Sequence, residues 1–172
     1  MIITIISVNI FIINLVVLYL LYKTHSEKIH RAKLKKRLHG IIPEKGSDES
    51  AGYDLYACID DSIEIAPQQT VLIGTGVSIT PPKGYFGAIF ARSGLATKKG
   101  LRPANCVGVA DWDYTGEYMV ALHNDSTETQ IINPRDRIAQ LVFLPYISVE
   151  FNMVEYLEQT ERGEGGFGHT GR

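Results

Sequence analysis

The chain has 172 residues, enough for one ordinary domain and an extension, and its 45% hydrophobic and 21% charged content is typical of a globular protein. Its two cysteines and five histidines show no metal-ligand spacing and suggest no disulfide framework, so neither a zinc module nor a disulfide-stapled scaffold is expected. From residue 38 onward the chain has 10 basic and 18 acidic residues. This excess of negative charge argues against nucleic-acid binding but still allows a small phosphate ligand.

Residues 1–22 are mostly apolar and carry no charged side chain. As an α-helix they would span about 33 Å, enough for a hydrocarbon core of ~30 Å, so they predict one transmembrane helix. The basic run at 23–37 then predicts a juxtamembrane linker that binds anionic lipid and places the following domain in the cytoplasm. The alternative is that the apolar run is not made and that the protein is simply cytoplasmic.

Residues 38–160 predict an all-β domain, a sandwich or a barrel. Short runs rich in valine, isoleucine, tyrosine and phenylalanine alternate with turn signals, and no 12-residue window repeats at helical period. The expected strands are 62–65, 70–73, 76–80, 85–90, 117–122, 130–132, 138–144 and 149–154.

Two polar clusters accompany the first strands. Asp54 is a lone carboxylate inside the apolar run 51–57, and because a buried carboxylate needs donors it is either a structural anchor or a catalytic group. Arg92, Ser93 and Gly94 directly follow the strand 85–90. They could converge on phosphate oxygens, although Arg-Ser-Gly is also an ordinary turn.

The segment 105–117 predicts a hairpin with a dense set of polar groups. Asn105 and the main chain could pair with the edge of a base, and Tyr114 offers a ring to a sugar. Asp111 is a candidate general base for a water molecule. The alternative is a solvated Asp/Gly turn.

Gln140 and the C-terminal tail complete the candidates. Gln140 is flanked by apolar residues, so its amide must be hydrogen-bonded, either to the backbone or to a phosphate. The tail 162–172 has five glycines, which make regular structure costly in entropy. Its Arg162 could bind a phosphate and its Phe167 could stack on a base, so it is either an arm that orders over a nucleotide or a frayed terminus.

The segments AGYDLYA, ARSGLA, NCVGVADWDYTGE, DRIAQLV and RGEGGFGHTG occur in the order of the five motifs of trimeric dUTPases, which the chain resembles over residues 34–172. The resemblance implies a small β jelly roll assembled as a homotrimer, with three active sites between subunits. Each site would take the hairpin from one chain, the phosphate loop from a second and the tail from the third. The implied reaction converts dUTP to dUMP and pyrophosphate, which limits uracil in DNA and supplies dUMP for dTMP synthesis.

The resemblance also implies roles for single residues. Asp111 matches the carboxylate that activates water, and Tyr114 matches the ring that excludes a 2′-hydroxyl. Asp54 is assigned no chemical step and is expected to be the structural anchor. Mg²⁺ would be held by the three phosphates and water rather than by protein ligands. The remaining matches contact the base and sugar (Asn105, Gly108, Val109, Ala110, Met119), the phosphates (Arg92, Ser93, Gly94, Gln140) or the substrate from the arm (Arg162, Phe167, Gly168).

The chain departs from the family at Ala110, Trp112 and Thr115, none of which is assigned to chemistry. The expected division is a membrane anchor at 1–22, a basic linker and start of the domain at 23–37, the β domain at 38–160 and the arm at 161–172. Two other functions remain open. One is a nucleotide-binding regulatory module, and the other is a dCTP deaminase-like enzyme, against which the hairpin and the arm both argue.

Overall fold

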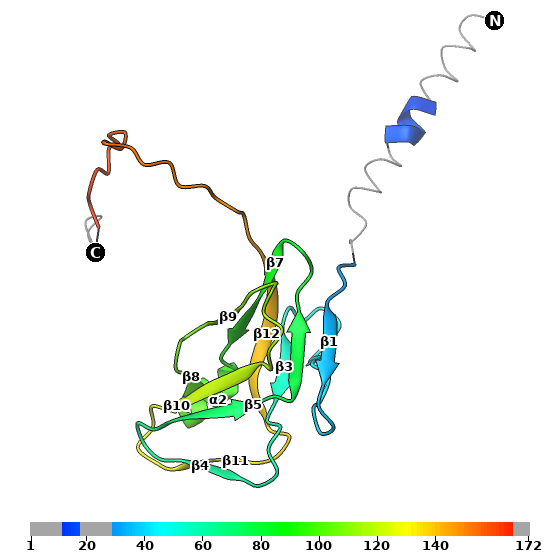
Figure 1. The fold of residues 1–172 in the computed structure, drawn as a ribbon, viewed down its shortest axis with the longest axis vertical. Helices are drawn as coiled ribbons and strands as arrows, with labels where there is room; N and C mark the ends of the chain where they lie inside the picture. The colour runs from blue at the N-terminus through cyan, green and yellow to red at the C-terminus, as the bar shows by residue number, and fades with distance from the viewer. Residues whose placement is uncertain (1–11, 18–28, 167–172) are drawn as a thin grey trace, which may run out of the picture.

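The computed structural model describes residues 12–17 and 29–166, and the regular secondary structure of the domain is mainly β-strand (Figure 1). The prediction of an all-β domain is confirmed. A short helix, α2 (Ser93–Lys99), interrupts the strands. In chain order the strands are β1 (Lys33–Lys36), β2 (Glu44–Lys45), β3 (Tyr53–Tyr56), β4 (Ile63–Ile65), β5 (Thr70–Gly74), β6 (Val77–Thr80), β7 (Tyr85–Phe90), β8 (Leu101–Pro103), β9 (Gly108–Ala110), β10 (Met119–Asn124), β11 (Gln130–Ile132) and β12 (Arg137–Pro145).

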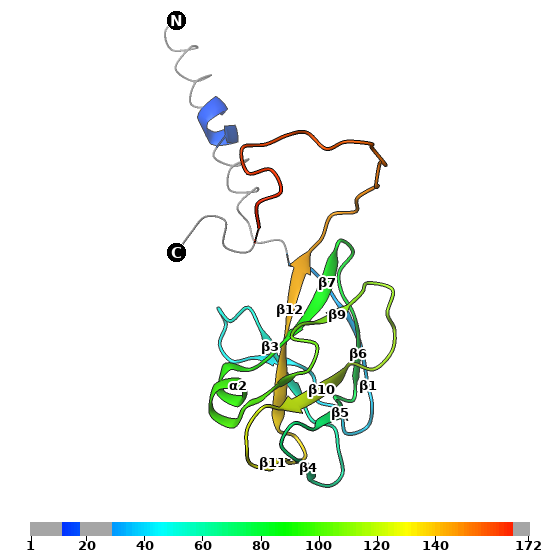
Figure 2. The same cartoon turned by 90° about the vertical axis from the view of Figure 1, so that its left-hand side faces the viewer.

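The strands form a five-stranded sheet in the order β2-β3-β12-β7-β9, a three-stranded sheet β5-β10-β8, and the two pairs β1-β6 and β11-β4. Every pair is antiparallel. β12 is the longest strand and pairs with both β3 and β7, so it runs through the middle of the domain (Figure 2). Its apolar run is typical of such a central strand, since both of its edges are hydrogen-bonded and much of it is buried.

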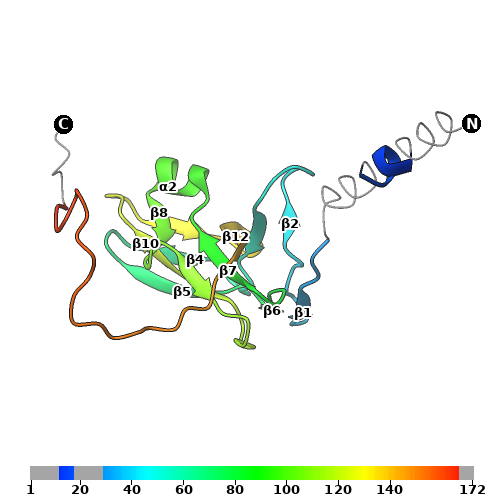
Figure 3. The same cartoon turned by 90° about the horizontal axis from the view of Figure 1, so that it is seen from above.

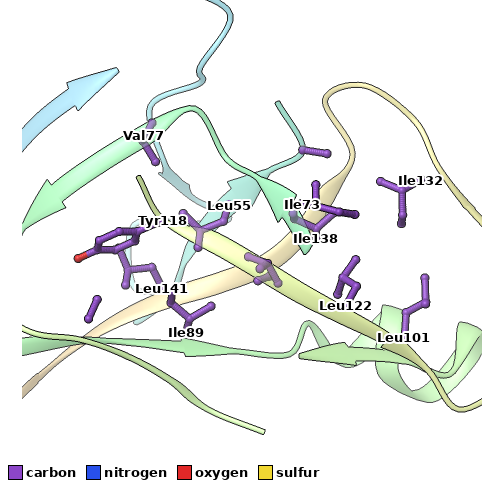
Figure 4. Close-up of a cluster of buried hydrophobic side chains, with 14 of the residues drawn as sticks. Leu55, Ile73, Val77, Ile89, Leu101, Tyr118, Leu122, Ile132, Ile138 and Leu141 are labelled. Carbon is purple, nitrogen blue, oxygen red and sulfur yellow. The ribbon is translucent and has the colours of Figure 1, made fainter. Parts of the chain in front are cut away.

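The core lies between the two larger sheets and is filled by aliphatic side chains from most strands (Figure 4). β10 alternates exposed or half-buried and buried residues, as expected for a strand with one face on the core. Tyr118, just before β10, is buried and its hydroxyl donates to the Ile79 carbonyl oxygen at 2.8 Å. Burial raises the pKa of Tyr118 to about 12, so the phenol stays protonated and keeps this hydrogen bond at neutral pH.

The predicted transmembrane helix is wrong. Over the described residues no helix is long and apolar enough to cross a membrane. Of the segment 1–22, the structure describes residues 12–17, which are helical. Residues 1–11 and 18–22 lie outside the described residues.

Part of the predicted basic linker belongs to the domain. Lys33–Lys36 form β1, which pairs with β6. β1, β2 and β8 were not expected, because strands of two to four residues with charged or proline positions carry no clear alternation. Helix α2 was also unexpected, since seven residues without a buried side chain give no helical period.

The expected strand at 149–154 is absent as a strand. The segment is extended but has no ladder partner within the described chain, and after β12 it runs away from the sheets (Figure 3). A β-strand needs a neighbour for its backbone hydrogen bonds, so apolar alternation alone did not decide the outcome here.

Candidate active site

A polar cavity of about 420 Å³ lies at one end of the five-stranded sheet. Asp54 comes from β3, Gln140 from β12, and Arg92 with Ser93 from the connection between β7 and α2. These segments are distant in sequence, but β12 pairs with β3 on one side and β7 on the other. The sheet register therefore brings three of the predicted polar clusters together.

Asp54 is the centre of this cavity's charge arrangement. Its Oδ1 forms an ion pair with Arg92 Nε at 2.8 Å, and its Oδ2 accepts a hydrogen bond from Arg137 Nη1 at 3.0 Å. The Asp54 side chain is only 14% exposed, and both of its oxygens are engaged by arginines. The two guanidinium groups of Arg92 and Arg137 outnumber the single carboxylate of Asp54, so this part of the cavity has an excess of positive charge. It is therefore suited to an anion such as phosphate.

The Asp54→Asn substitution is expected to lower the free energy of unfolding by about 1–3 kcal/mol, because two guanidinium groups lose their common acceptor. Urea denaturation monitored by circular dichroism measures the change. Asp61→Asn is the matched control, since Asp61 is exposed. Equal unfolding midpoints for the two variants would contradict the anchoring role.

The remaining predicted residues of this cavity have different surroundings. The Gln140 amide donates to the Ala91 carbonyl oxygen at 2.9 Å, so of the two alternatives the structure shows a backbone bond. Ser93 begins α2 and is exposed, and an added Cβ on Gly94 would meet open space. Arg137 was missed as a site residue, although a charged residue directly before a buried strand was the available signal.

The segment 105–117 is not the predicted two-stranded hairpin. β9 pairs with β7 in the five-stranded sheet, whereas β10 belongs to the other large sheet, so residues 111–118 connect the two sheets. Asn105 and Asp111 are exposed in this segment. Of the predicted base and sugar contacts, Gly108, Val109 and Ala110 form β9 and Met119 opens β10.

Tyr114 is held within the connection between the sheets. Its hydroxyl donates to the Glu117 carbonyl oxygen at 3.0 Å, and its ring stacks on Tyr118 with centroids 6.2 Å apart. Tyr114 is still 46% exposed, so part of the residue is accessible to a ligand.

Asp111 lines a second cavity, of about 630 Å³. Trp112, Asp113, Val109, Phe86 and Tyr146 form the rest of its wall. Trp112 is 45% exposed and was noted from the sequence only as a departure from the family. Among the described residues the two cavities share no wall residue, so one chain does not bring Asp111 into the same cavity as Arg92 and Gln140.

The predicted arm is described only up to residue 166. Arg162 is exposed, and its Nε donates to the Gly165 carbonyl oxygen at 2.7 Å within a local turn. Phe167 and Gly168 lie outside the described residues. Within the described ranges no group of three or more His, Cys, Asp or Glu side chains could hold a metal ion.

Comparison with known proteins identifies the family. The dUTPase family profile matches residues 39–171. The deoxyuridine 5′-triphosphate nucleotidohydrolase of Salmonella typhimurium strain LT2 is 46% identical over 132 residues, which cover 76% of this chain and 87% of the relative. The Klebsiella pneumoniae protein of the same name is 47% identical over the same coverage.

Solved structures give the same result. The dUTPase of Staphylococcus bacteriophage 80alpha with dUpNHpp superposes with a TM-score of 0.72 at 27% identity, covering 84% of this chain and 100% of the other. The dUTPase of phage phi11 of S. aureus superposes with a TM-score of 0.66 at 25% identity, covering 76% of this chain and 99% of the other. The chain therefore belongs to the dUTPase family.

Proposed function

We propose that this protein is a dUTP diphosphatase, which hydrolyses dUTP to dUMP and pyrophosphate. The observation that carries the proposal is a positively charged cavity around Arg92 and Arg137, together with an exposed carboxylate, Asp111, that lines a second cavity. The names of the relatives and the dUpNHpp-bound phage enzyme support the choice of substrate.

In the proposed mechanism Asp111 orients and deprotonates a water molecule that attacks the α-phosphorus. The exposure of Asp111 leaves its carboxylate free of burial cost and open to solvent water. The arginine-rich cavity binds and positions the triphosphate, because phosphoryl transfer depends mainly on positioning and charge stabilisation. Tyr114 packs against the deoxyribose and leaves no room for a 2′-hydroxyl.

Mg²⁺ is proposed as the cofactor. The ion prefers phosphate oxygens and retained water, so substrate phosphates can supply most of its coordination. The residues present fit this arrangement, since the cavity around Asp54 offers guanidinium donors to phosphate oxygens rather than a cage of carboxylates. When bound, the ion would neutralise charge on the phosphates.

A homotrimer with shared active sites is proposed as the assembly. Since Asp111 and Arg92 line different cavities of one chain, a site that contains both has to combine two chains. The extended segment after β12 supports this, because the alternate residues Ile147, Val149, Phe151 and Met153 are between 62% and 97% exposed. Such an exposed apolar segment is expected to pack against a neighbouring subunit.

A pyrophosphate-release assay with dUTP, dCTP, dTTP and UTP tests the proposed activity. We expect kcat/KM for dUTP to exceed that for each of the others by at least ~10²-fold, since a site that hydrogen-bonds its substrate rejects analogues strongly. Pyrophosphate release with no preference for dUTP would contradict the substrate assignment. Ammonia release from dCTP would instead indicate a deaminase, and nucleotide binding without turnover would indicate a regulatory module.

A further inference from the structure

The carboxylate of Glu117 joins three parts of the molecule. Its Oε1 accepts the backbone N–H of Gly76 at 2.8 Å, in the turn between β5 and β6. Its Oε2 accepts an Nη1 proton of Arg37 at 3.1 Å, just after β1. Glu117 itself ends the connection that carries Asp111 and Tyr114, so its side chain ties this connection to the β5–β6 turn and to the N-terminal segment.

Tyr114 depends on the position of Glu117. Two hydrogen bonds orient Tyr114 in the described chain. Its hydroxyl donates to the Glu117 carbonyl oxygen, and its backbone N–H donates to the Asp111 carbonyl oxygen. The tyrosine ring is otherwise held by stacking on the buried Tyr118. A shift of residue 117 would therefore be passed to the ring that is proposed to face the sugar.

The turn that receives the carboxylate is tightly packed, which makes it a firm anchor. Gly76 has a φ of +70°, and an added Cβ there would come within 2.6 Å of the Cys58 Sγ and 2.7 Å of the Gly40 Cα. The Gly76 carbonyl oxygen also accepts the Arg37 backbone N–H at 2.7 Å. The same turn thus holds both the Glu117 side chain and the Arg37 backbone.

We propose that Glu117 is a positioning residue for sugar selection, and that Arg37 supports it from the N-terminal segment. The inference rests on the proposed function, because it assigns to Glu117 the placement of the Tyr114 ring against deoxyribose. Glu117 does not contact the nucleotide in this scheme. It holds the ring where a 2′-hydroxyl would clash, so its loss relaxes discrimination between dUTP and UTP.

The two contacts of Glu117 differ in strength. The Arg37 side chain is 72% exposed and the Glu117 side chain 22%, so the ion pair is screened by water while the bond to the Gly76 N–H is better shielded. Glu117→Gln keeps an acceptor for Gly76 and loses the ion pair, whereas Glu117→Ala loses both. The alanine variant is therefore expected to have the larger effect.

The test measures kcat and KM for dUTP and UTP in the full chain. For Glu117→Ala we expect the dUTP/UTP ratio of kcat/KM to fall about 10-fold, through a higher KM for dUTP and a gain with UTP. Glu117→Gln and Arg37→Ala are expected to lower it about 2–3-fold. Glu64→Gln and Arg31→Ala, both at exposed positions, are the matched controls. A fall in the ratio with melting temperatures close to that of the parent supports positioning.

A Tyr114→Ala variant separates failure of this inference from failure of the proposed function. If Tyr114→Ala lowers the dUTP/UTP ratio while both Glu117 variants keep the parent value, the inference is overturned and the role of Tyr114 stands. If Tyr114→Ala also keeps the parent ratio, the assignment of Tyr114 fails and the inference fails with it. Equal losses of kcat with dUTP and UTP in the Glu117 variants would indicate general damage to the fold and would overturn the inference too.

Discussion

Asp111→Asn is expected to lower kcat for dUTP hydrolysis about 10³-fold while the protein stays folded and keeps the assembly of the parent. The amide has nearly the same size as the carboxylate but cannot take a proton from water. Asp111 is exposed, so the substitution removes no buried interaction and has little reason to alter stability. Pyrophosphate release measures turnover, and sedimentation velocity measures the assembly.

Asp113→Asn is the matched control for this prediction. Asp113 follows on the same connection and lines the same cavity, but no chemical step is assigned to it. If Asp111→Asn kept the parent turnover, the assignment of Asp111 as the base would fall. If Asp113→Asn were the inactive variant, the base would lie two residues from its predicted position.

Deletion of residues 162–172 is expected to lower kcat/KM for dUTP about 10²-fold or more, with a melting temperature close to that of the parent. In the described structure the chain after β12 extends away from the sheets, and residues 162–166 make local hydrogen bonds and none with the sheets (Figures 1 and 3). An arm that closes on the substrate would instead contribute during catalysis, by adding phosphate contacts and excluding water. Full activity in the truncated chain would show that the tail is only a terminus.

Mixing the two inactive variants tests whether the sites are shared. Full-length Asp111→Asn supplies the tail but not the base, and the truncated chain supplies the base but not the tail. Co-refolded mixed trimers are expected to regain activity, because some of their sites combine an intact Asp111 with an intact tail from different chains. Activity no higher than that of the separate variants would place each site within one chain.

Asp54 could be selected as a candidate site residue from the sequence because a carboxylate conflicts with its local context. Asp54 lies in an apolar strand, and a carboxylate there requires donors. The structure supplies them as Arg92 and Arg137, and only the pairing of β12 with β3 and β7 shows that these are the partners. Arg137 itself was not selected, because an arginine at the start of a strand is ordinary until its partner is known.

Several errors have one physical cause. The spacing of apolar residues shows which face of a segment can be buried, but it does not show whether another segment is present to cover that face. Apolar residues alternate along 149–154 as in a strand, but this segment has no ladder partner in the described chain. In contrast, β1 and β2 form without such a pattern because they pair with β6 and β3.

The sequence by itself determined the all-β class and the order of the five motifs, since strand periodicity, turn residues and motif spacing are local properties of the chain. Only the tertiary structure decided that Asp54 forms ion pairs with two arginines and that the connection 111–118 joins two sheets. It also decided that the Glu117 side chain bonds to Gly76 and Arg37. These contacts span 38 to 83 positions along the chain. They depend on sheet register and strand order, which short-range patterns do not encode.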